Sequence, residues 1–149
     1  MKRVYRFLFA LHVFVGVGAV FGGLAAITNP KAPLGIPIEI LRNSPFSDFF
    51  IPGIILFTLI GLGNIVCALL FRFKLRYQGY ISSVFSWALV IWIVVQCIML
   101  NSIEALHIIF FTIGLIKATL SIIILYEQRL FPINLFLNFY NGIRKEDSR

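Results

Sequence analysis

Four long, largely apolar stretches decide what this chain can fold into. They run over residues 7–27, 49–71, 81–100 and 105–125. Each has about 20 residues, and an α-helix of that length spans about 30 Å, the thickness of the hydrocarbon core of a bilayer. Because the bilayer offers no water to unpaired backbone groups, such segments cross it as helices. The sequence therefore predicts an all-α integral membrane protein with four transmembrane spans.

The composition and the connections define the fold further. The 149 residues are 60% hydrophobic and 13% charged, whereas a soluble domain is about half apolar and about a quarter charged. So much apolar surface does not fit into one small core, which argues against a soluble domain. The loop over residues 28–48 is long and the other two connections are short, and short connections join antiparallel neighbours. We expect residues 1–128 to form an antiparallel four-helix transmembrane bundle.

Basic residues lie between the spans and mostly on one side of the predicted membrane. Ten of the 13 lysines and arginines precede the first span, separate the second from the third, or follow the fourth. The other side has only Lys31 and Arg42, both in the long loop. Cytoplasmic loops of membrane proteins are enriched in Lys and Arg. We therefore expect both termini in the cytoplasm and residues 28–48 on the outer side.

The segment after the fourth span, residues 129–149, differs from the spans. Pro132 suits the first turn of a helix, and Gly142 suits the position after its end. Three asparagines recur at i, i+4 and i+7 on an otherwise apolar segment: Asn134, Asn138 and Asn141. This pattern predicts an amphipathic helix in the cytoplasmic interface, followed by a charged tail.

Small residues mark helix faces where close packing is expected. Gly18 and Gly22 form a GxxxG pair in the first span, and Gly61 and Gly114 lie within the second and fourth spans. Small residues at this spacing allow helix backbones to approach each other closely. Two interpretations of the first-span ridge stay open, since the motif alone does not separate them. It packs within the bundle, or it forms a seam with a protein partner or a second copy.

No pattern that carries known catalysis is present in the sequence. It lacks the common zinc-protease, nucleophile-elbow, redox-cysteine and phosphate-loop motifs, and it lacks the ligand spacing of a metal site. We therefore expect a non-enzymatic protein without catalytic residues, metal or cofactor. Its expected partner is the lipid bilayer and not a nucleic acid.

Lys117 is the single charged residue deep inside a span. A lysine at mid-membrane costs about 2.5–3.5 kcal/mol on insertion scales. It shares a helix face with Gly114 and Ser121, and small or polar residues on one face indicate contact with protein. Three interpretations remain open. The ammonium group extends to the head groups; it pairs with Asn64 at the same depth, or with Glu39 if the outer loop descends; or it binds an anionic ligand.

The candidate ligand-binding residues are the polar side chains within the spans: Lys117, Asn64, Gln96 and His107. From the sequence we expect an accessory or interaction subunit, or a binder of lipid or another small ligand. The alternative is a small transporter or channel with an intramembrane site around Lys117 and Asn64.

The stretch S-P-F-S-D-F-F-I-P-G, residues 44–53, is the most distinctive in the chain. Together with Gly22–Gly23 and the W-I-V-V-Q segment from Trp92 to Gln96, it resembles a group of small bacterial four-span membrane proteins of uncharacterised function. The resemblance covers most of residues 16–125. It implies a multi-pass protein of the bacterial cytoplasmic membrane and transfers no active-site residue. A remoter similarity to DoxX-like proteins rests on topology alone.

The charge distribution makes the topology testable. A reporter enzyme that works only in the cytoplasm should be active when it is fused after Arg149. The Lys31→Cys variant should react with a membrane-impermeant thiol reagent in intact cells. Labelling of that cysteine only after the cells are permeabilised would contradict the assigned orientation.

Overall fold

In the computed structural model, residues 2–127 are described, and their regular elements are helical. Four helices in this range are long and apolar enough to cross a membrane: Lys2–Thr28, Phe50–Arg72, Gln78–Leu100 and Ala105–Glu127. The first is α1 (Lys2–Thr28), and the last two are α4 (Gln78–Leu100) and α5 (Ala105–Glu127). The second consists of α2 (Phe50–Ile55), a π-helical segment η3 (Leu56–Leu62) and α3 (Gly63–Arg72). The predicted interfacial helix at residues 129–149 lies outside the described residues.

The helices reach beyond the apolar runs at several ends. α1 begins five residues before residue 7, and α4 begins three residues before residue 81. Hydropathy marks the apolar part of a segment, whereas a helix continues until a capping residue or a turn ends its backbone hydrogen bonding. Asn101 ends α4 in the left-handed conformation, with φ 45° and ψ 35°, which Asn adopts more readily than most residues.

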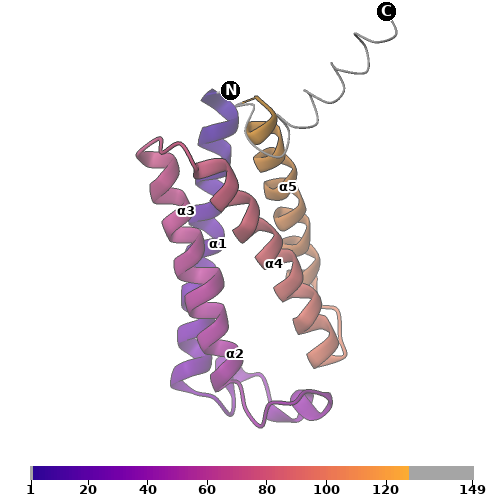
Figure 1. Ribbon diagram of the computed structural model, residues 1–149. Coiled ribbons are helices and arrows are strands. Elements are labelled where there is room, and N and C mark those ends of the chain that lie inside the picture. Colours follow the sequence, from indigo (N-terminus) through magenta and orange to yellow (C-terminus); the bar gives the residue numbers. More distant parts are fainter. Residues whose placement is uncertain (1, 128–149) are drawn as a thin grey trace, which may run out of the picture.

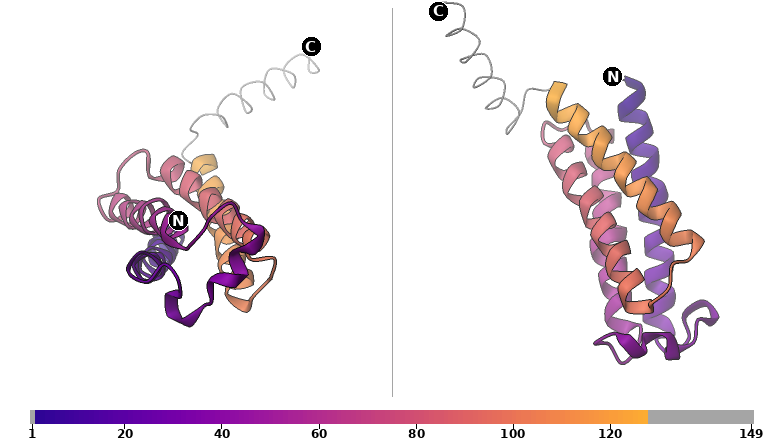
Figure 2. Two further views of the ribbon diagram at one scale, coloured as in Figure 1. Left: turned by 90° about the horizontal axis from the view of Figure 1, so that it is seen from below. Right: turned by 90° about the vertical axis from the view of Figure 1, so that its right-hand side faces the viewer.

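The four long helices form a bundle with alternating connections (Figure 1). α1 begins at the end where α5 stops, and the segment between α1 and α2 lies at the other end, with the α4–α5 turn. α1 packs against α2, η3 and α3, and α4 packs against α5. The two pairs meet where α3 adjoins α4 and where α1 adjoins α5. Seen along the bundle in Figure 2, α1 therefore lies diagonally across from α4, and α3 from α5.

Glycines bring α1 very close to the second span. A Cβ on Gly23 would lie 2.6 Å from the Cβ of Phe57, and one on Gly16 would lie 2.9 Å from a side-chain carbon of Ile65. From the other side, a Cβ on Gly61 would lie 2.9 Å from Val20. The buried small face of α1 thus contains Gly16 and Gly23, seven residues apart.

The glycines expected to mediate packing have different surroundings. Gly61 and Gly114 lie in tight contacts, and a Cβ on Gly114 would approach Val90 of α4 to 2.7 Å. Gly22 is half-buried beside Leu56. Gly18 is exposed, and a Cβ there would meet only Phe110, at 3.7 Å. Gly18 and Gly22 are therefore turned partly away from the closest helix contact. The rotation of α1 places Gly16 and Gly23, in their stead, against the second long helix.

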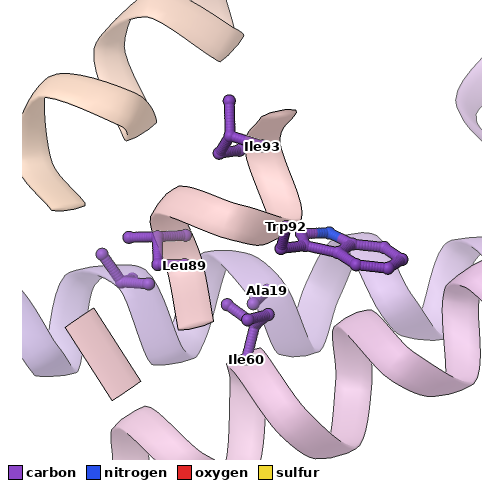
Figure 3. Close-up of a cluster of buried hydrophobic side chains, with 6 residues drawn as sticks. Ala19, Ile60, Leu89, Trp92 and Ile93 are labelled. Carbon is purple, nitrogen blue, oxygen red and sulfur yellow. The ribbon is translucent and has the colours of Figure 1, made fainter. Parts of the chain in front are cut away.

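The apolar core lies where α1, η3 and α4 converge (Figure 3). Leu89, Trp92 and Ile93 of α4 are buried with Ala19 of α1 and Ile60 of η3. α1 and α4 lie diagonally across the bundle, and η3 contacts both of them. The core therefore holds the two helix pairs together in the half of the bundle toward the α4–α5 turn.

The loop between α1 and α2 closes the same end of the bundle. It contains two 3₁₀ turns, η1 (Pro33–Gly35) and η2 (Ile38–Asn43), and η2 packs against α4. Leu41 is buried with Ala26, Phe49 and Met99. This contact explains why the second half of the loop is apolar. Beside it, Asp48 accepts a hydrogen bond from the backbone N–H of Phe50, at 3.0 Å, and so satisfies one of the unpaired N–H groups at the start of α2.

The contrast between two glycines of α1 is testable. Gly23→Ala should lower the free energy of unfolding by about 1–3 kcal/mol, because the new methyl group collides with backbone atoms of Phe57. Gly18→Ala is the matched control and should change stability by less than about 0.5 kcal/mol. Steric-trap unfolding in bilayer discs measures both. Equal losses for the two variants would show that the close contact is not at Gly23.

Candidate functional site

Lys117 lies in the interior of the bundle with an exposed fraction of 0%. Its Nζ donates a hydrogen bond to Oδ1 of Asn64, which is equally buried. The Asn64 amide nitrogen donates to the backbone oxygen of Ile60 at 2.7 Å. The carbonyl edge of Asn64 is therefore free to face the lysine, and this edge can only accept hydrogen bonds.

His12 of α1 shares the same acceptor. Its Nδ1 lies 2.8 Å from Asn64 Oδ1, and its Nε2 lies 2.8 Å from the hydroxyl oxygen of Ser82 on α4. Because Asn64 Oδ1 only accepts, Nδ1 carries a proton and donates. The ring stacks on Phe71 with centroids 5.7 Å apart. These contacts fix the orientation of the imidazole.

Serines of α4 and α5 extend the cluster. The hydroxyl oxygens of Ser82 and Ser121 are 2.6 Å apart, and Ser121 also lies 2.8 Å from the backbone oxygen of Lys117. Ser86 donates to the backbone oxygen of Ser82 at 2.6 Å. All three serines have an exposed fraction of 0%. The buried polar cluster of this protein is therefore His12, Asn64, Ser82, Ser86, Lys117 and Ser121.

The cluster joins helices that lie diagonally across the bundle. The His12–Ser82 contact links α1 to α4, and the Lys117–Asn64 contact links α5 to α3. The other two contacts, His12–Asn64 and Ser82–Ser121, link neighbouring helices. Four helices thus meet in one hydrogen-bonded group. Such bonds contribute about 0.6 kcal/mol each on average inside a membrane and reach about 1.7 kcal/mol.

The structure excludes two of the open interpretations of Lys117. Its ammonium group does not extend to the head groups, since the residue is completely buried. Glu39 does not descend to meet it, because this residue is exposed on η2. Its neighbour Ile40 packs against the cluster that contains Leu41 and Met99. The pairing of Lys117 with Asn64 is confirmed.

No carboxylate of residues 2–127 accompanies Lys117. The acidic residues of this range are exposed or half-buried, in the loop between α1 and α2 or at helix ends: Glu39, Asp48, Glu104 and Glu127. The hydrogen-bond acceptor of the ammonium group is the neutral amide of Asn64. The charge of a lysine at this position is thus not offset by an anion from the described part of the chain.

The structure separates the other two candidate residues from this cluster. His107 lies ten residues before Lys117 on α5, which corresponds to about 15 Å along the helix. Gln96 is half-buried in the C-terminal half of α4. Of the four candidates, the structure brings together Lys117 and Asn64 only.

Reasoning from the sequence missed His12, Ser82 and Ser121 as members of the site. A histidine within a helix is more often a satisfied polar group than a ligand, so its residue type alone does not assign His12 to a site. One signal was available: His12 lies five residues from the start of the first apolar stretch and Asn64 seven residues from the end of the second, a difference in depth of about 3 Å. Its rotation toward Asn64 is set by the glycine contact of α1, which hydropathy does not reveal.

The cluster has no composition suited to a metal. Among residues 2–127, no group of three His, Cys, Asp or Glu side chains is arranged to hold a metal ion. Comparison with protein-family models, with curated proteins and with solved structures finds no match to the chain. The resemblance to small bacterial four-span membrane proteins therefore stays a prediction.

The Lys117–Asn64 contact predicts opposite effects for its two partners. Lys117→Met should leave stability unchanged or raise it, because Asn64 keeps His12 as a donor and a buried charge is removed. Asn64→Leu should lower the free energy of unfolding by about 3–5 kcal/mol, because it leaves a buried ammonium group without its acceptor.

The double variant provides the control. Lys117→Met in the Asn64→Leu background should recover at least about 1 kcal/mol, as expected for coupled residues. Steric-trap unfolding free energies of the four proteins give the coupling. Additive effects would contradict the pairing.

Proposed function

We propose that this chain is a non-enzymatic, multi-pass protein of the bacterial cytoplasmic membrane. Its four helices cross the bilayer in antiparallel order, with both termini in the cytoplasm. The length and hydropathy of the helices support this proposal, as does the concentration of basic residues at one end of the bundle.

Within that framework, the buried polar cluster is a binding site for a small ligand with an anionic group. The supporting observation is Lys117, a cation in the interior whose acceptor is a neutral amide. An ammonium group has three donors, and the described residues accept from it at Asn64 alone. A carboxylate or a small inorganic anion would offset the charge and accept the remaining hydrogen bonds. Ionisable residues inside membranes commonly mark such sites.

A route to this site requires movement of the helix pairs, since the cluster is fully buried. The second span has a feature suited to such movement. Its π-helical segment Leu56–Leu62 ends two residues before Asn64, and Asn64 donates to Ile60 within it. π-helical turns inside α-helices are frequent at functional sites. Rearrangement of this segment would shift Asn64 relative to Lys117.

The same segment favours one second function, a small transporter. If the site opens alternately toward the two sides of the membrane, the ligand is carried across; if it opens toward one side, the protein is a binder. An accessory subunit is the remaining function, in which the cluster serves only to hold the helices together.

Anion-dependent stability tests the proposal. Purified protein is titrated with sodium chloride, acetate or phosphate, compared at the same ionic strength, and its unfolding temperature is measured. A ligand that binds only the folded protein stabilises it by about 2.7 kcal/mol at a hundredfold excess over Kd. At least one of the anions should raise the unfolding temperature of the native sequence.

Two variants assign the effect to the site. Lys117→Met should abolish the shift. Lys31→Met removes the same charge from the exposed outer loop and should preserve it. If none of the three anions stabilises the protein, or if the shift survives in Lys117→Met, the anion site is refuted and the accessory role is favoured.

A further inference from the structure

A second site lies at the far end of the α4–α5 pair, away from the buried polar cluster. An open pocket of about 900 Å³ extends over the last turns of α4, the connecting turn and the first turns of α5. Small-molecule sites have volumes of about 300–1,000 Å³. Most of its lining is aliphatic or aromatic, and the polar groups are Asn101, Ser102 and His107.

His107 presents one defined hydrogen-bond donor at this pocket. Its Nδ1 accepts the backbone N–H of Glu104 at 3.0 Å, the role that Glu or Gln plays in a capping box. A nitrogen that accepts carries no proton, so the proton of the neutral ring is on Nε2. His107 is only 9% exposed, and no residue among 2–127 accepts a hydrogen bond from Nε2.

The apolar lining is exposed to the surroundings of the bundle. Ile98 is 69% exposed, and Ile103 and Ile108 are exposed as well. Apolar side chains of this kind on a membrane helix contact acyl chains. The turn with Asn101 and Ser102 lies at the end of the bundle, at the depth where head groups begin under the proposed membrane placement. The matching ligand has an apolar body and a hydrogen-bond acceptor near one end.

We propose that this pocket binds one phospholipid molecule, with an acyl chain along Ile98 and Ile108 and an ester carbonyl oxygen accepting from His107 Nε2. A transmembrane helix of a partner protein fits less well, because its backbone carbonyls are already paired within the helix and would leave the histidine donor unsatisfied. The proposal rests on the membrane placement of the helices and is independent of the anion site at Lys117.

Native mass spectrometry of the whole protein tests this site. The protein is released from vesicles of phosphatidylethanolamine and phosphatidylglycerol, and the retained phospholipid is counted. Ile98→Trp fills the pocket, whereas Ile91→Trp places the same group at a similarly exposed position of α4 (60%) that does not line it. The native sequence and Ile91→Trp should retain one lipid, and Ile98→Trp should lower its affinity on the order of tenfold, or about 1.4 kcal/mol.

Two substitutions of His107 separate the hydrogen bond from helix capping. Glutamine and glutamate at this helix position both accept the Glu104 N–H, so both variants should fold. Only glutamine also offers a donor to an ester carbonyl. His107→Gln should retain the lipid, and His107→Glu should lose it.

Three results would overturn the proposal: equal retention in Ile98→Trp and Ile91→Trp, retention in His107→Glu, or cross-linking of Ile98→Cys to a protein in place of lipid. Lys117→Met should keep the lipid. Loss of the anion effect and loss of the lipid are therefore distinguishable, because each has its own variant.

Discussion

The oxygen atom of the Asn64 side chain is the point on which the interior of the bundle depends. It accepts from Lys117 of α5 and from His12 of α1, while the amide nitrogen of the same side chain is held by Ile60. Lipid tails are as apolar as leucine, so the hydrophobic effect does little to join helices inside a membrane. Shared polar groups and close packing must do so. This one acceptor connects three of the four helices.

Two kinds of contact divide the bundle. Glycine allows α1 and the second span to pack backbone against backbone, as at Gly23 and Phe57, and α4 packs along α5. Between these pairs, the apolar core around Trp92 and the buried polar cluster make the connection. The loop between α1 and α2 adds Leu41 against Met99 at one end.

The sequence predicted four helices long and apolar enough to cross a membrane, and it placed Asn64 and Lys117 at the same depth, because both follow from hydropathy. Hydropathy gives the depth of a residue along its helix, and two interior polar groups at one depth tend to meet. It does not give the rotation of a helix. Gly18–Gly22 and the pair Gly16 and Gly23 lie on different faces of α1, and the packing selects the second face. The same rotation brings His12 into the buried polar cluster. The packing face of α1 and the role of His12 were therefore not predicted for the same reason.

The account requires that the polar cluster couples helices across the bundle, and a double-mutant cycle on His12 and Ser82 measures this most directly. His12→Phe and Ser82→Ala, alone and combined, give a coupling free energy by steric-trap unfolding in bilayer discs. We expect about 0.5–1.7 kcal/mol, the range of interhelical hydrogen bonds in membranes. Ser83→Ala, one residue along the same helix, should show no coupling to His12. Strict additivity of His12→Phe and Ser82→Ala would contradict the account.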